Sequence, residues 1–144
     1  MTELVPAYEG KKPYLFVSYA HKDSDLVLPV IAKMFEKKYR VWYDEGIAPG
    51  SEWPKNIADH LNAADGVIVF VSENYLASPN CENEVVRAAE GKKTIFRYSL
   101  DGSTHPKLTG ENSIAVGSAD DLIAAIPEQY VGDGTGYERS IGKQ

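Results

Sequence analysis

Residues 66–71 restrict the possible folds of this chain more than any other segment. They read GVIVFV, and the polar residues Ser72, Glu73 and Asn74 follow directly. A strand with apolar side chains on both faces is typical of the centre of a parallel sheet that helices cover above and below. The sequence therefore predicts an α/β domain built around this strand.

The other apolar segments alternate with helical patterns, as expected for strands joined by crossover helices. We expect five strands, at residues 14–18, 40–43, 66–71, 94–99 and 113–116. We expect helices at residues 23–38, from a cap at Ser51 through Leu61, at 79–90 and at 119–126, where Pro127 ends the last one. In the first helix the core-facing positions are predicted to be Leu26, Val30, Ile31, Met34 and Phe35.

The predicted domain covers residues 13–127. Residues 1–12 are expected to be a flexible segment, and residues 128–144, which are rich in glycine, a flexible tail or the start of a linker to a further domain. Residues 101–112 are polar and contain Gly102, Pro106 and Gly110, so a mobile loop is expected there.

The helix at residues 79–90 places a carboxylate beside the core. Ser78 is a favoured N-cap and Pro79 suits the first helical position, while Gly91 is expected to end the helix. Its apolar stripe is predicted to contain Cys81, Val85, Ala88 and Ala89, with Glu84 on the edge of that stripe. A simpler interpretation is that Glu82 and Glu84 are acidic residues favoured by the helix dipole.

Composition excludes several classes of partner. The chain has 144 residues, 43% of them hydrophobic, and a net charge of -6, which argues against nucleic-acid binding by bulk electrostatics. No apolar run approaches the ~20 residues of a membrane-spanning helix, and no secretion signal is recognisable. A single cysteine allows no internal disulfide, so we expect a cytoplasmic protein. His21, His60 and His105 are isolated, and no metal site is predicted.

Three segments together resemble the Toll/interleukin-1 receptor (TIR) domain family, and its prokaryotic branch most of all. They are PYLFVSYAHKD at residues 13–23, VWYDEGIAPG at 41–50 and SENYLASPNCENE at 72–84. They occur in the family's order, and the resemblance covers about residues 13–126. It implies a flavodoxin-like three-layer sandwich with five parallel strands in the order 2-1-3-4-5.

The resemblance also implies an activity. Glu84 matches the catalytic glutamate of the family members that cleave NAD+, which is then a substrate and not a cofactor. In the implied strand order, Ser18, Tyr19, the loop at residues 44–50 and Glu84 converge at the carboxyl edge of the sheet, where ligands bind in such folds. The expected product is nicotinamide with ADP-ribose or a cyclic isomer, and the expected setting is prokaryotic antiviral defence or effector signalling.

Further residues are expected to bind the substrate. Tyr19 would pack against a base or the nicotinamide ring, and Lys22 would meet the pyrophosphate. The complete predicted substrate-binding set is Ser18, Tyr19, Lys22, Asp44, Ile47 and Cys81. The resemblance also marks a loop for contacts with other TIR domains: Asp44, Glu45, Gly46, Ile47, Ala48, Pro49 and Gly50.

Alternatives remain for these residues and for the chain as a whole. Ser18 can be a strand-end residue that bonds the backbone, Cys81 a small buried hydrophobe, and Trp42 and Trp53 packing residues. The chain can also be a TIR scaffold that assembles without chemistry, or a relative that processes nucleosides. A phosphoacceptor receiver lacks its acidic residues at the ends of the first and third strands, and a Rossmann dehydrogenase lacks its glycine motif.

Overall fold

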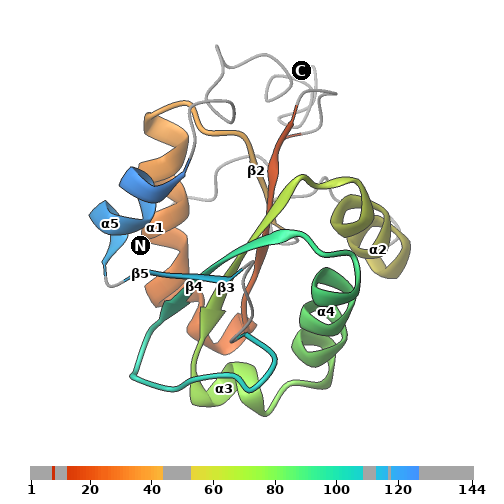
Figure 1. Cartoon of the computed structure of the whole chain (residues 1–144). Helices are drawn as coiled ribbons and strands as arrows, with labels where there is room; N and C mark the ends of the chain where they lie inside the picture. The colour runs from red at the N-terminus through yellow and green to blue at the C-terminus, as the bar shows by residue number, and fades with distance from the viewer. Residues whose placement is uncertain (1–7, 9–12, 44–52, 109–112, 117, 127–144) are drawn as a thin grey trace.

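A central parallel sheet lies between two layers of helices (Figure 1). The structure is a computed structural model that describes residue 8 and residues 13–43, 53–108, 113–116 and 118–126. The sheet has five strands in the order β2-β1-β3-β4-β5, and every neighbouring pair is parallel. The predicted flavodoxin-like architecture and strand order are confirmed.

The strands lie at the predicted places. Their bounds are β1 at Leu15–Ser18, β2 at Val41–Trp42, β3 at Gly66–Val71, β4 at Thr94–Ser99 and β5 at Ser113–Val116. All six residues of β3 are buried, as the apolar run predicted for a strand covered on both faces.

The helices cover the two faces in pairs. Their bounds are η1 at His21–Asp23, α1 at Ser24–Glu36, α2 at Trp53–Ala63, α3 at Glu73–Leu76, α4 at Pro79–Glu90 and α5 at Ala119–Ala125. In Figure 1, α1 and α5 lie on one side of the sheet and α2 and α4 on the other, while the short α3 follows the end of β3. Lys33 of α1 and Asp120 of α5 form an ion pair of 2.7 Å, which joins the first pair of helices.

Aromatic stacking fixes which strand residues face α2. The ring of Phe16 stacks on Trp42 with a centroid distance of 5.3 Å, and Trp42 stacks on His60 of α2 at 4.4 Å. Because side chains alternate along a strand, Ser18 shares this face with Phe16. Trp42 is therefore a packing residue, and the side chain of Trp53 lies outside the described part of the chain.

Two predicted core positions are wrong. Leu26 is 57% exposed, because the buried stripe of α1 runs through Val27, Val30, Ile31 and Met34, and Leu26 lies outside it. Ala89 is exposed because the stripe of α4 is centred on Cys81, Val85 and Ala88.

Two segments that were expected to be loose contribute to the core. Tyr8 is buried, and its backbone N–H donates to the carbonyl of Val41 at 2.9 Å. In the loop after β4, His105 and Leu108 are also buried. Two side chains of this loop therefore pack inside the domain, which its polar composition did not indicate.

Candidate functional site

Glu84 reaches the carboxyl end of β1 from the neighbouring helix. The hydroxyl of Ser78 accepts the N–H of Cys81 at 3.2 Å, which caps α4, and Pro79 is its first residue, as predicted. Glu84 then lies in the second turn and is half-buried. Its Oε1 accepts a hydrogen bond from the Ser18 hydroxyl at 2.5 Å. This length falls in the range of a hydroxyl that donates to a carboxylate.

The hydroxyl of Ser18 forms hydrogen bonds with side chains and not with the backbone. It is 1% exposed, and its Oγ lies 2.7 Å from the hydroxyl of Tyr75 as well as 2.5 Å from Glu84. The alternative of a backbone-bonding strand end is therefore wrong for its side chain. The two partners come from α3 and α4, 57 and 66 residues away in the sequence.

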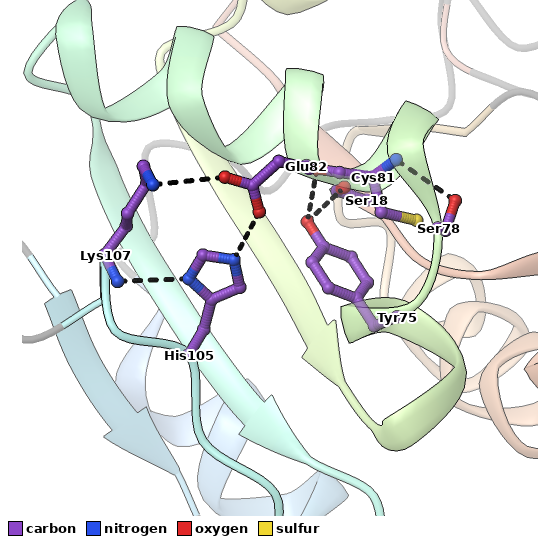
Figure 2. Close-up of polar contacts among 7 residues, drawn as sticks. All are labelled: Ser18, Tyr75, Ser78, Cys81, Glu82, His105 and Lys107. Atoms are coloured by element: carbon purple, nitrogen blue, oxygen red, sulfur yellow. Dashed lines mark hydrogen bonds and ion pairs between the residues drawn. The ribbon is translucent and has the colours of Figure 1, made fainter.

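Tyr75 is buried, and its hydroxyl points toward Ser18 (Figure 2). Its hydroxyl also lies 3.4 Å from the carbonyl oxygen of Cys81. Burial raises the pKa of Tyr75 well above its ordinary value, with smaller contributions from Cys81, Glu84 and Glu82, while the hydrogen bond with Ser18 acts in the opposite direction. The phenol therefore keeps its proton at neutral pH.

A second buried carboxylate supports α3. The carboxylate of Asp23 accepts hydrogen bonds from the Ser72 hydroxyl and, at 2.8 Å, from the amide of Asn74. The same Ser72 oxygen accepts the N–H of Tyr75 at 3.0 Å and so caps α3. Asp23 lies at the start of α1, as predicted, but its side chain makes no cap there. It instead connects that helix start to the end of β3.

The loop after β4 contacts Glu82 of α4 (Figure 2). His105 Nε2 lies 2.9 Å from Glu82 Oε1, and the ammonium of Lys107 lies 3.1 Å from Glu82 Oε2. The backbone N–H of Lys107 donates to His105 Nδ1 at 3.0 Å. Nδ1 therefore accepts, and Nε2 carries the hydrogen that is donated to Glu82. The hydrogen bond from His105, followed by that from Lys107, lowers the pKa of Glu82.

The remaining predicted site residues have mixed positions. Cys81 is buried beside the Tyr75 hydroxyl. Tyr19 is only 4% exposed and its ring lies 5.4 Å from that of His21, so its surroundings are those of a core residue. Lys22 is exposed in η1. Asp44, Ile47 and the rest of the predicted contact loop at residues 44–50 lie outside the described residues.

The described residues offer neither a cluster for a metal ion nor a membrane-spanning helix. They contain no group of three or more His, Cys, Asp or Glu that could hold a metal ion. Nor does any helix within the described ranges combine the length and apolar character needed to cross a membrane.

Sequence reasoning missed Tyr75 and His105 as site residues. Tyr75 had a usable signal, because it follows a buried strand by four positions and Ser72 is a favoured N-cap three residues before it. His105 had none, since its partner Glu82 is 23 residues away and lies on another element.

Comparison with known proteins agrees with the fold. The sequence profile of the TIR domain matches residues 15–129. The protein named "Uncharacterized protein y4lF" from Sinorhizobium fredii (strain NBRC 101917 / NGR234) is 32% identical over 83 residues. That alignment covers 54% of this chain and 26% of the relative, so the chain matches about a quarter of that protein's length.

A solved structure shows the same architecture. It is the TIR domain of the Toll-related receptor TRR-2 from Hydra magnipapillata, crystal form I, with a TM-score of 0.60 and 15% sequence identity. The superposition covers 76% of this chain and 84% of that chain. At this identity the similarity concerns the fold alone.

Proposed function

This chain belongs to the TIR domain family, and on that basis we propose that it cleaves the bond between nicotinamide and ribose in NAD+. Glu84 would be the catalytic residue. The observation that supports this role is the hydrogen bond of 2.5 Å between Glu84 and Ser18, because it holds a carboxylate at the carboxyl end of β1. The strand order reverses between β1 and β3, and ligands of open parallel sheets bind at that point.

One carboxylate is sufficient for this reaction. Nicotinamide leaves as a neutral molecule, so no second acid is needed to protonate it, unlike the oxygen leaving group of an ordinary glycoside. The ribose develops positive charge at its anomeric carbon as the bond breaks. A fixed, half-buried carboxylate stabilises that charge without having to reorganise.

The test is incubation of concentrated protein with NAD+, followed by chromatography of nicotinamide and of the ribose product. Glu84→Gln should lower the rate of nicotinamide release by about a hundredfold or more, because it removes the charge while preserving the shape of the side chain. Glu90→Gln is the matched control on the same helix, since Glu90 is exposed at its last turn.

Two results would contradict the proposal. One is an unchanged rate in Glu84→Gln; the other is no nicotinamide release from the folded parent protein at any concentration. The second result would favour a TIR scaffold that acts through contacts with other TIR domains. The product analysis also distinguishes linear ADP-ribose from a cyclic isomer.

A further inference from the structure

We infer that Tyr75 is a positioning residue for Glu84 and acts through the hydroxyl of Ser18. This inference rests on the proposed catalytic role of Glu84 and adds the groups that orient its carboxylate. The three residues come from three elements, β1, α3 and α4, which meet at one edge of the sheet.

The available hydroxyl protons determine the direction of the two hydrogen bonds. Ser18 has one hydroxyl proton, and it is donated to Glu84 Oε1, since an ionised carboxylate only accepts. The contact of 2.7 Å between Ser18 and Tyr75 must then use the proton of Tyr75. The Cys81 carbonyl at 3.4 Å is the poorer acceptor for that same proton. The chain of donors therefore runs from Tyr75 to Ser18 to Glu84.

This direction has a consequence for the carboxylate. A hydroxyl that accepts one hydrogen bond is polarised and donates a stronger one, and the low dielectric of a buried site increases the effect. Tyr75 also prevents the Ser18 hydroxyl from rotating away, because the acceptor side of its oxygen is occupied. Glu84 is thus held with one oxygen fixed on β1.

The position of Tyr75 is itself fixed on several sides, one of which is formed by His105 (Figure 2). The backbone N–H of Tyr75 donates to the Ser72 hydroxyl oxygen. That hydroxyl in turn donates to the carboxylate of Asp23. The edge of its ring meets His105, with centroids 6.3 Å apart and an interplanar angle of 81°. Its high pKa, caused mainly by burial, keeps it a donor across the physiological range. A rigid donor of this kind orients its partner at little entropic cost.

Three variants test the inference: Tyr75→Phe, Ser18→Ala and the double variant. Tyr98→Phe is the matched control, because the ring of Tyr98 packs against Phe70 and its hydroxyl makes no hydrogen bond within the described residues. In the sheet register, Tyr98 of β4 lies opposite Phe70 of β3, and Ser18 of β1 lies opposite Val69 of β3. Val69 and Phe70 are adjacent, so their side chains point to opposite faces of the sheet. The control therefore lies on the opposite face of the sheet.

In NAD+ cleavage, Tyr75→Phe should lower kcat about five- to tenfold with KM within about twofold of the parent, the pattern of a lost transition-state interaction. Ser18→Ala should lower kcat about ten- to a hundredfold, because it removes the hydrogen bond to the carboxylate directly. The double variant should match Ser18→Ala, since Tyr75 has nothing to act through once Ser18 is gone. Additive losses, or a kcat for Tyr75→Phe equal to that of Tyr98→Phe, would overturn the inference.

A second readout does not depend on activity. The carboxyl carbon of Glu84 has an NMR shift at neutral pH that reports its hydrogen bonding. Tyr75→Phe and Ser18→Ala should both move this shift, and Tyr98→Phe should not. If the folded parent releases no nicotinamide, the proposed function fails and the shift alone decides the orienting role. If the shift is the same in Tyr75→Phe and the parent, Tyr75 does not position Glu84.

Discussion

Asp23 shows how much one buried carboxylate contributes at this edge of the sheet. It is 6% exposed, and its two oxygens accept from Ser72 and Asn74, which both follow β3. A charge removed from water is tolerated only when hydrogen bonds replace its hydration. The position of Tyr75 depends on the same Ser72, so Asp23 stabilises the site through Ser72.

We predict that Asp23→Asn lowers the free energy of unfolding by about 1.5–3 kcal/mol, the range for hydrogen bonds to a charged group. The NH2 group of the new amide is a donor at a position where a carboxylate oxygen accepts a hydrogen bond in the parent. Chemical denaturation measures the change, with Asp25→Asn as the control, since Asp25 is exposed in the first turn of α1. Equal stabilities of the two variants would show that the contacts of Asp23 add nothing to folding.

Among the elements, those whose limits depend on local chemistry were predicted well. The start of α4 follows from Ser78 and Pro79, and the bounds of β3 from an uninterrupted apolar run. Gly91 ends α4 as expected, although the residue with a left-handed backbone is Lys92, at φ 55°. Each of these signals lies within a few residues of the boundary it sets.

The contacts that build the site could not be predicted in the same way. Ser18 was expected to converge with Glu84 at the edge of the sheet or, as the alternative, to bond the backbone, and its contact with Tyr75 was not anticipated. The loop at residues 101–112 looked mobile from its composition, yet His105 is buried against α4. The contacts between side chains depend on the register and twist of whole elements. Local patterns in a single sequence do not give that register or twist.

The attachment of this loop to α4 should weaken in acid. The pKa of Glu82 is lowered chiefly because His105 donates to it. Its stabilising effect is therefore complete above the ordinary glutamate pKa of about 4.3 and is lost as the pH falls through the lower folded value. The parent should be more stable than Glu82→Gln above about pH 5, and the difference should shrink as the pH falls through the lowered pKa of Glu82. Denaturation at several pH values measures it.

The control for this prediction is Glu90→Gln, which removes a carboxylate from the same helix without removing a contact to the loop. Its difference from the parent should not follow the same pH dependence. A constant difference between the parent and Glu82→Gln over this range would mean that the ion pair and the hydrogen bond are too solvated to matter.

In the molecule as a whole, the site is assembled from parts of the described chain that lie far apart in the sequence. β1, η1, α3, α4 and the loop after β4 all meet at the carboxyl edge of the sheet. At the opposite edge of the sheet, the backbone N–H of Tyr8 donates to the carbonyl of Val41, the first residue of β2. Because the parallel strands all point to one edge, residues that are remote in the sequence share a site without any local signal.

The last prediction concerns association between whole molecules. Its basis is the sequence of residues 44–50, where apolar Ile47 stands among Gly46, Pro49 and Gly50 in a predicted turn, and the family resemblance that marks this loop for TIR contacts. If packing of the loop favours the competent site, the specific activity toward NAD+ should rise with protein concentration.

Ile47→Glu should suppress that rise, because it places a charge in the contact, while the control Leu26→Glu on exposed Leu26 of α1 should not. Activity assays paired with sedimentation from nanomolar to high micromolar protein measure both. A specific activity that stays constant, from a protein that stays monomeric at every concentration, would show that NAD+ cleavage does not depend on association.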